Sequence, residues 1–223
     1  MPHTKPSKHS VRTAVEREVR RRFGHESTGH DFWHIERVRT MALRIARVEK
    51  ADSYIVELAA LTHELDDAKL VKGGHPDKPK RAIAVLRKAG ADAATIMRVA
   101  DAVRSVSFRG AKVKTPAKTM EAKAVQDADR LDANGAIGIA RAFAYGGKKG
   151  RALHDPSQKP LLHASWEQYQ KRDSSTINHL HEKSLLLKDR MQTRTGKKMA
   201  EKRHHYLKEY VRQFLKEWKG RIE

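Results

Sequence analysis

The sequence of 223 residues predicts a single all-α domain, and three observations support this prediction. Apolar residues recur at steps of three and four along most of the chain, which is the periodicity of one face of an α-helix. Short alternating runs bounded by turn signals, which would indicate strands, are missing. Hydrophobic residues make up 39% of the chain, so a sizeable core can form even though 33% of the residues are charged. We therefore expect a compact helical bundle without a sheet.

Two amphipathic helices are predicted in the first third of the chain, joined near residues 50–52. Asp31 and Asp52 precede the two apolar patterns and are suited to accept hydrogen bonds as N-caps. The apolar positions are Ile35, Val38, Ala42 and Ile45 in one helix and Ile55, Leu58, Thr62 and Leu65 in the other.

Further helices are predicted over about 78–90, 92–106, 117–132 and 134–145, with glycines near each break and Gly146-Gly147 at the end of the last. A long amphipathic helix closes the chain. We expect residues 1–9 to be flexible and residues 146–160, rich in Gly, Lys and Pro, to form a mobile loop within one domain spanning residues 1–223. The apolar and aromatic positions of the last helix are Tyr206, Leu207, Tyr210, Val211, Phe214, Leu215 and Trp218.

The chain is strongly basic, with 47 Lys and Arg against 27 Asp and Glu and a formal charge of +20. Such an excess suits nucleic acid, an anionic surface or a phosphate-bearing small substrate. Aromatic residues make up only 6%, and no basic stripe carries regularly interleaved aromatics, so a single-strand nucleic-acid platform is not favoured. From Lys188 onward, 12 Lys and Arg face 5 Asp and Glu, which indicates a solvated helical face first and an anion-attracting rim second.

The absence of cysteine excludes disulfides, thiolate metal sites and cysteine nucleophiles, and it fits a reducing compartment. No run approaches the roughly 18 apolar residues that a membrane span needs, and the start MPHTKPSKHS lacks a secretory apolar stretch. The sequence predicts a cytoplasmic protein that does not associate with membranes. It does not indicate an oligomeric state.

Candidate metal ligands occupy matching helical positions. His34 and His63 each lie four residues from an apolar position of their helix, so both imidazoles could point inward. Glu64 follows His63, and Asp129 lies on a later helix. Two imidazoles and two carboxylates suit a divalent ion with open positions for water or phosphate oxygens. Taken singly, each histidine is more simply explained as a hydrogen-bonded core residue, and spacing alone does not show that the four side chains meet.

Several segments together resemble the HD-domain metal-dependent phosphohydrolase superfamily, in its bacterial branch of small stand-alone hydrolases. The resemblance implies an HD-type helical bundle in which His34, His63, Glu64 and Asp129 bind one divalent metal. The family is named for an adjacent His-Asp pair, and this chain has His63-Glu64, which lengthens the carboxylate arm by one methylene. The segments are HDFWHIERV (30–38), AALTHELDDAKL (59–70), SFRG (107–110), VQDADRLDANGAIGIARAF (125–143), YGGKKGR (145–151) and HEKSLLLKDRMQTRTGKKMAEKRH (181–204).

Asp67 is the predicted general acid or base. It lies four residues after His63, which on a continuous helix places it one turn further along the same face. The resemblance assigns an acidic residue at this offset to proton transfer during phosphate hydrolysis. The alternatives are a surface aspartate paired with a lysine, and the neighbouring Asp66, which is rotated about 100° around the helix.

Phosphate binding requires positive charge over the nonbridging oxygens. We expect His30, Lys69, Arg130 and Arg141 to contribute to it, although Arg130 is equally explained by an ion pair with a nearby aspartate and His30 by capping or orienting its helix. The run Gly146–Gly150 could cradle a phosphate through its amides, but a solvated basic loop is the more economical interpretation because the spacing is not that of a P-loop.

The resemblance implies a metal-dependent phosphohydrolase acting on nucleotides, with nucleoside triphosphates cleaved to monophosphate and pyrophosphate. Dephosphorylation of nucleoside monophosphates is the second possibility. A binding module that has lost hydrolysis at the His63-Glu64 pair is the third, and it would retain nucleotides or nucleic acid. We expect Mn²⁺ as the metal, with Mg²⁺, Fe²⁺, Co²⁺ and Ni²⁺ as alternatives.

Overall fold

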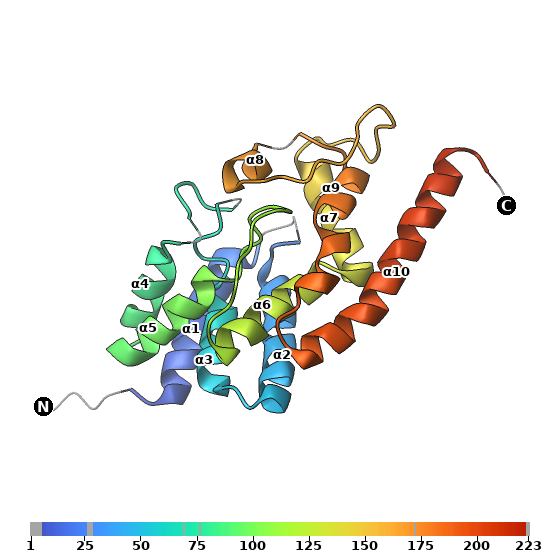
Figure 1. The fold of residues 1–223 in the computed structure, drawn as a ribbon. Coiled ribbons are helices and arrows are strands. Elements are labelled where there is room, and N and C mark those ends of the chain that lie inside the picture. Colours follow the sequence, from blue (N-terminus) through green and yellow to red (C-terminus); the bar gives the residue numbers. More distant parts are fainter. Residues whose placement is uncertain (1–5, 26–28, 69, 76, 172, 222–223) are drawn as a thin grey trace, which may run out of the picture. The chain divides into compact units, whose positions relative to one another are not determined.

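The computed structural model describes residues 6–25, 29–68, 70–75, 77–171 and 173–221 (Figure 1). All regular structure among these residues is helical, which confirms the predicted all-α fold and its long C-terminal helix. Contacts divide the chain into two compact units. The first unit comprises Met1–Phe108 and Thr115–Asp129, and the second comprises Arg109–Lys114 and Arg130–Glu223. The arrangement of residues 1–223 as one domain stays a prediction.

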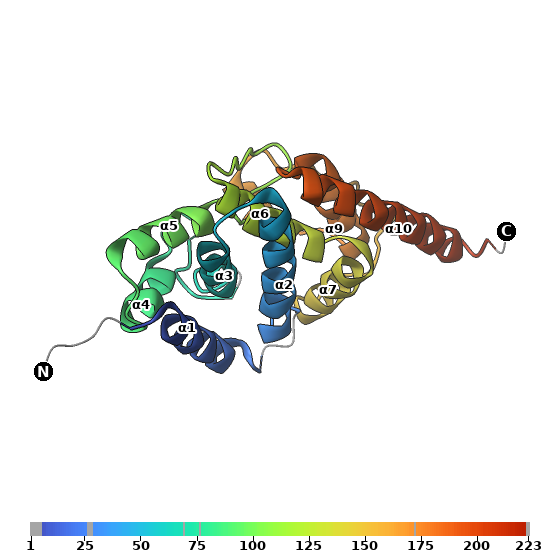
Figure 2. The same ribbon diagram turned by 90° about the horizontal axis from the view of Figure 1, so that it is seen from below.

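The first unit is built around α3, a short helix that is buried on every side. Its helices are α1 (Lys8–Phe23), α2 (Phe32–Glu49), α3 (Ser53–Thr62), α4 (Lys80–Lys88), α5 (Ala93–Arg104) and α6 (Met120–Asp132) up to Asp129. Every residue of α3 from Ile55 to Thr62 is buried, and the helix contacts α1, α2 and α5. Figure 2 shows α3 enclosed by these neighbours. A helix that is apolar on nearly every side needs such cover.

Local capping sets the beginnings of α2 and α3 where the sequence predicts them. The Asp31 carboxylate accepts from the His34 amide, and the Asp52 carboxylate accepts from the amides of Tyr54 and Ile55. Lys50 ends α2 in the left-handed conformation, with φ of 57°. The turn between the two helices is therefore short, and it fixes how they face each other.

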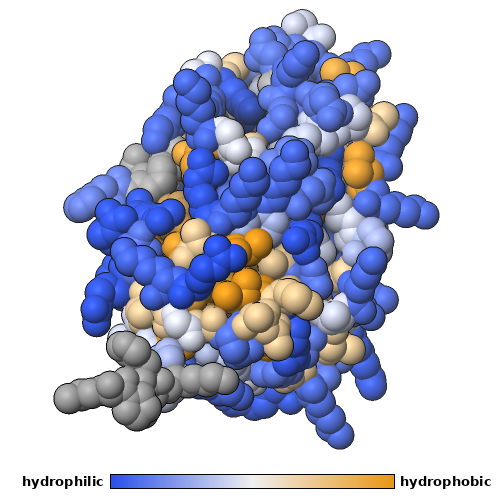
Figure 3. Space-filling model, turned by 90° about the vertical axis from the view of Figure 1, so that its left-hand side faces the viewer, coloured by the Kyte–Doolittle hydropathy of each residue, from blue (hydrophilic) through white to orange (hydrophobic). Residues whose placement is uncertain are grey.

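The face in Figure 3 is dominated by hydrophilic residues, with apolar side chains gathered near its centre. In the described part of the chain, no helix combines the length and the apolar composition that a bilayer span requires.

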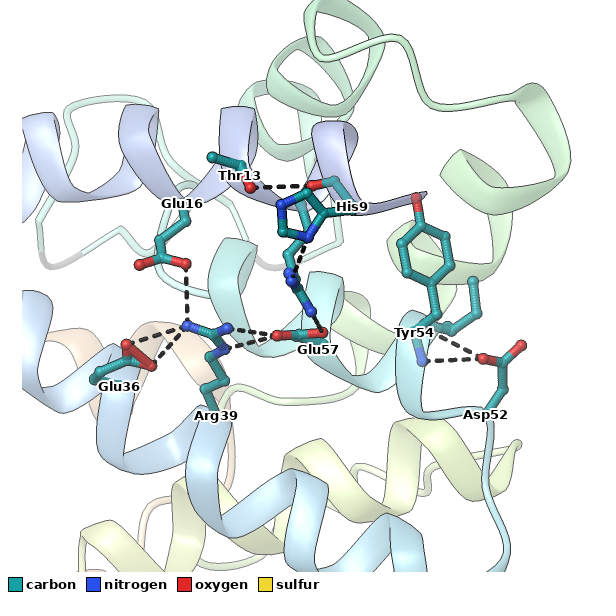
Figure 4. A network of polar contacts seen from close by, with 10 residues as sticks. His9, Thr13, Glu16, Glu36, Arg39, Asp52, Tyr54 and Glu57 are labelled. Carbon is teal, nitrogen blue, oxygen red and sulfur yellow. Dashed lines mark hydrogen bonds and ion pairs between the residues drawn. The ribbon is translucent and has the colours of Figure 1, made fainter. Parts of the chain in front are cut away.

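One half-buried arginine connects three helices of the first unit (Figure 4). Arg39 of α2 donates at 3.0 Å to Glu57 of α3 and to Glu36 of its own helix, and at 3.2 Å to Glu16 of α1. Burial lowers the pKa of Arg39, but the hydrogen bond to Glu57 and the three carboxylate charges outweigh it and raise the pKa. The guanidinium thus stays charged where α1, α2 and α3 meet.

The second unit has a smaller core between α7, α9 and α10. It contains α7 (Gly135–Lys148), α8 (Trp166–Gln170), α9 (Thr176–Glu182), the 3₁₀ turns η1 (Ser184–Leu186) and η2 (Lys188–Arg190), and α10 (Arg194–Trp218). Aromatic residues extend this core outward: Phe143 and Tyr210 pack partly buried against it, and Phe214 stacks on Trp218 at 5.9 Å. The buried core residues are Ile139, Ile177, Leu180, Leu207 and Val211.

The structure corrects two predicted flexible segments in part. Lys8 and His9, placed in the flexible start, are already helical, and α7 continues through Gly146 and Gly147 to Lys148. Gly146 lies within the helix and does not end it. The absence of a side chain at this position allows Thr176 to approach closely. Beyond α7, the carbonyls of Ala152 and Leu153 accept from α9 amides at 3.0 Å, while mobility of the remaining loop stays a prediction.

Candidate metal centre

Four side chains from three places in the first unit converge on one point. His34 lies in the first turn of α2, His63 and Glu64 directly follow α3, and Asp129 lies on α6. Each offers one ligand atom, and these atoms all lie within 4.8 Å of one another. The predicted ligands therefore meet, which spacing along the sequence could not establish.

The ligand atoms are close and mostly shielded from water. His34 Nε2 lies 3.0 Å from Glu64 Oε1 and 3.6 Å from Asp129 Oδ1, while His63 Nε2 lies 3.3 Å from His34 Nε2. His34 is completely buried and Glu64 is 4% exposed, whereas Asp129 is half-buried. The cluster is therefore open mainly on the side of Asp129.

The second nitrogen of His63 fixes how this imidazole faces the cluster. His63 Nδ1 lies 2.7 Å from the carbonyl oxygen of Ala60. Because a carbonyl only accepts, Nδ1 carries a proton, so that the ring in its neutral form presents the lone pair of Nε2 to the cluster. This is the state in which an imidazole binds a metal ion.

The residues present fit a divalent cation. Two imidazole Nε2 atoms face each other, and Glu64 Oε2 is buried without a hydrogen-bond partner among the residues that the structure describes. Buried acceptors that face one another are costly unless a cation or a donor satisfies them. Two nitrogens and two carboxylates suit a borderline divalent ion better than Mg²⁺, which prefers oxygen ligands.

The charges of the cluster shift its own acid–base equilibria. Burial lowers the pKa of His63, but the hydrogen bond and charge of Glu64, together with the charge of Asp129, outweigh it and raise the pKa to about 9. Burial raises the pKa of Glu64, and the three neighbouring histidines overcome this effect and hold the pKa well below its usual value. Without a metal, a proton on His63 therefore offsets part of the negative charge of Glu64 and Asp129.

Metal binding is expected to strengthen as the pH rises. Because the metal must displace the proton of His63, whose pKa is about 9, the association constant should increase about tenfold per pH unit between pH 6.5 and 8.5. Calorimetric titration of metal-stripped protein in buffers of different ionisation enthalpy measures both the affinity and the protons released. An association constant independent of pH over this range would contradict the raised pKa.

The chain leaves its helical path immediately at the ligands. The apolar pattern predicts a helix through Leu65, but α3 ends at Thr62, and the amides of Leu65 and Asp67 donate to carbonyls three residues back. Asp67 is therefore not one helical turn beyond His63, as the sequence argument assumes. Its side chain is half-buried, and its carbonyl accepts from the amides of Leu70 and Val71 at 3.1 and 3.0 Å.

Asp66, the alternative proton carrier, has a structural role. Its carboxylate is 3% exposed and accepts from the backbone amides of Arg81 and Ala82 at 3.0 Å. It thereby satisfies amides at the first turn of α4, fifteen residues further along the chain. Asp66 is not available for proton transfer without leaving this helix end uncapped.

Replacing Asp66 with alanine is expected to lower the free energy of unfolding by about 1–2 kcal/mol, the usual cost of a lost helix cap. The metal ligands are unchanged, so turnover per folded molecule should stay near the wild-type value. Urea unfolding followed by circular dichroism measures the first quantity and a steady-state assay the second. Unchanged stability would show that α4 does not depend on this carboxylate.

The predicted phosphate-binding residues have different surroundings. His30 Nδ1 lies 3.1 Å from Glu64 Oε1, so this residue borders the metal cluster and can orient its glutamate. Lys69 lies outside the described residues. Arg130 donates to the carbonyl of Arg190 and Arg141 pairs with Asp132 at 3.1 Å, all within the second unit.

The glycine-rich run at the end of α7 does not offer its amides to a phosphate. The amides of Lys149 and Arg151 donate to the Gly146 carbonyl at 3.1 and 2.9 Å, and that of Gly150 donates to Gly147 at 3.1 Å. These bonds close the end of the helix. The segment is an ordinary basic turn, in agreement with the more economical interpretation of its sequence.

The sequence argument overlooked Gln126, which positions α6. This side chain is completely buried and donates to the carbonyl of Thr115 at 2.7 Å and to that of Ser105. Gln126 lies three residues before Asp129. Its two hydrogen bonds therefore hold in place the turn of α6 that presents this ligand. The signal in the sequence was weak: Gln126 directly follows Val125 and lies four residues after Ala122, and both are buried.

Comparison with known proteins places the chain in a family. No family model matches it. The chain is 40% identical over 201 residues to the uncharacterised protein YpgQ of Bacillus subtilis, covering 87% of both chains. A crystal structure from Lactobacillus plantarum superposes with a TM-score of 0.84 at 32% identity, over 96% of this chain and 99% of the other.

Two further crystal structures bear on the activity. An HD-superfamily hydrolase from Bacillus thuringiensis is 34% identical with a TM-score of 0.69, over 96% of this chain and 99% of the other. Bacillus subtilis YpgQ in complex with ADP is 36% identical with a TM-score of 0.69, over 95% and 97%. Together with the ligand cluster formed by α2, α6 and the residues directly after α3, this similarity assigns the chain to the HD-superfamily hydrolases, in the small bacterial branch that includes YpgQ.

Proposed function

We propose that this hydrolase cleaves nucleoside triphosphates to the monophosphate and pyrophosphate. The observation that carries the proposal is the convergence of His34, His63, Glu64 and Asp129 within 4.8 Å, open on the side of Asp129. The nucleotide class is supported by the complex of YpgQ with ADP. In the proposed reaction water attacks the α-phosphorus, the bond from that phosphorus to the bridging oxygen breaks, and pyrophosphate leaves.

The four ligands would hold one divalent ion, and we propose Mn²⁺. The two imidazoles favour a borderline metal, and the two carboxylates favour one that also accepts oxygen ligands. Such an ion would act as a Lewis acid on a phosphoryl oxygen and lower the pKa of a water molecule. The protein contributes the fixed geometry: Ala60 orients His63, and His30 contacts Glu64.

Asp67 is the proposed general acid or base. It lies three residues after Glu64, its backbone is held by hydrogen bonds on both sides, and its half-buried side chain remains accessible. The neighbouring carboxylate of Asp66 is committed to α4. Asp67 would accept the proton that the attacking water loses. His30 and Lys69 are proposed to bind the phosphates, and His30 is supported by its position beside Glu64. For Arg130 and Arg141, which belong to the second unit, phosphate binding remains a proposal from the sequence alone.

A nucleotide panel tests the proposal. Metal-stripped protein is incubated with ribo- and deoxyribonucleoside triphosphates and monophosphates plus Mn²⁺, and pyrophosphate and orthophosphate are measured separately. We expect equal amounts of monophosphate and pyrophosphate, and neither in a matched incubation with excess chelator. Orthophosphate alone from monophosphates would instead identify a nucleotidase. Tight nucleotide binding without any product would identify a binding module.

A further inference from the structure

The positive charge of the chain is concentrated in one of its two units. The second unit holds 24 Lys and Arg against 10 Asp and Glu, a formal +14, whereas the first holds 23 against 17, a formal +6. The metal cluster lies in the first unit. A small phosphate substrate at that cluster therefore leaves most of the excess charge unexplained. Charge asymmetry between parts of a chain indicates a polyanionic partner.

Much of this charge forms a stripe along α10. Its members follow one another at steps of three and four residues, which places them within about 120° of the helix circumference. All but Lys216, which is half-buried, are exposed. Two glutamates, Glu201 and Glu209, fall in the same sector, so the lysines and arginines of the stripe retain a formal +5. The basic stripe consists of Arg194, Lys198, Lys202, His205, Lys208, Arg212, Lys216 and Lys219.

The opposite face of α10 is fixed to the second unit. Leu207 and Val211 are buried in its core, and Tyr210 and Phe214 pack against that core. The 25 residues of α10 extend about 37 Å at 1.5 Å per residue, so the basic stripe is a long, held row of cations. Most of the apolar face packs against this core, although Trp218 near its end is 47% exposed, so little of the face is left to insert into a membrane. Exposed pairs such as Arg212–Glu209 at 2.8 Å add little stability, so folding does not explain the row.

We propose that the basic stripe of α10 binds the phosphate backbone of double-stranded nucleic acid. A duplex presents about one negative charge per 1.7 Å of its axis, a linear density that a straight cationic row complements. The basic stripe contains no aromatic residue, so it lacks the stacking platform that single strands require. Contacts to phosphates alone carry no base preference, so the binding is independent of sequence. DNA and RNA duplexes share this chemistry.

The test compares two variants that carry the same net charge. The stripe variant combines Lys198→Gln, Lys202→Gln, Lys208→Gln and Arg212→Gln. The control variant combines Arg44→Gln, Arg47→Gln, Arg87→Gln and Lys88→Gln, which are exposed positions of the first unit. Binding of labelled 20-base-pair DNA and RNA duplexes is followed by fluorescence anisotropy between 50 and 200 mM salt. A chelator removes the metal centre from the measurement, and circular dichroism verifies that each variant is folded.

We expect wild type to bind with a slope of log K against log salt of about −4 to −6, which corresponds to about five phosphate contacts. The stripe variant should bind at least about tenfold more weakly with a slope reduced by about 3, while the control changes less than about threefold. A preference for DNA or for RNA then identifies which duplex is bound.

Three outcomes would overturn the proposal. Equal losses in both variants would assign the binding to diffuse net charge. Tighter binding of a single strand of the same length would remove the duplex as partner. Binding of vesicles with anionic lipids, with no binding of either duplex, would make a membrane surface the partner. Because the measurement needs neither nucleotide hydrolysis nor metal, its outcome is independent of the proposed enzyme activity.

Discussion

Replacing Asp67 with asparagine is expected to lower turnover by about 10²–10⁴-fold, the usual contribution of a general acid or base. The amide keeps the size of the side chain but cannot accept the proton of the attacking water. The four metal ligands are unchanged, so metal content and the urea midpoint should stay at wild-type values. Single-turnover rates at saturating metal measure the effect on the chemical step.

Asp66→Asn provides the matched control because it is the same chemical change one residue earlier. It alters the cap of α4 and leaves Asp67 intact, so it should affect unfolding more than turnover. If Asp67→Asn turns over nearly as fast as wild type, Asp67 has no part in proton transfer. If Asp66→Asn is instead the slow variant, with normal stability, the roles of the two carboxylates are reversed.

Replacing Glu64 with alanine is expected to weaken metal binding at least about tenfold, the lower limit seen even for partners outside the ligand set. The change removes one ligand and one of the negative charges that offset a divalent cation, and it leaves three histidines without the carboxylate that they contact. Glu64→Asp should retain the metal, because it keeps the charge and restores the His-Asp pair for which the family is named. Metal analysis after gel filtration, followed by titration of stripped protein, measures both.

The activity and metal affinity of Glu64→Asp show whether the longer side chain of Glu64 strains the site or is accommodated by it. If the extra methylene strains the site, Glu64→Asp should be at least as active as wild type. If the surrounding helices have adapted to glutamate, Glu64→Asp should bind metal more weakly. Equal metal content and activity in wild type and Glu64→Ala would reduce the site to His34, His63 and Asp129.

The sequence was most informative where local chemistry decides the structure. The N-caps at Asp31 and Asp52 and the long last helix follow from neighbouring residues, and the structure confirms them. Helix α1 was overlooked although Val11, Val15 and Val19 recur at steps of four, a signal that predicts it. The short α8 and α9 lack enough periodicity for such a prediction.

Long-range contacts account for what sequence spacing could not supply. Leu65 is buried and continues the apolar period of α3 although the helix has ended, so periodicity alone overestimates its length. The link from Asp66 to α4 depends on how the chain folds back after residue 66. The meeting of the four ligands was implied only by resemblance to a family, because three separate segments must pack together to form it.

Helix α1 carries none of the four metal ligands, but it supplies part of the Arg39 network. A guanidinium shared by carboxylates on α1, α2 and α3 is fully compensated only when all three helices are in place. Glu57, its partner on α3, lies six residues before His63, and Arg12 of α1 also pairs with it at 3.5 Å. A minimal fragment beginning at α2 would contain every ligand yet leave this charge cluster incomplete. Engineering of the metal centre should therefore retain α1 as part of the folding unit.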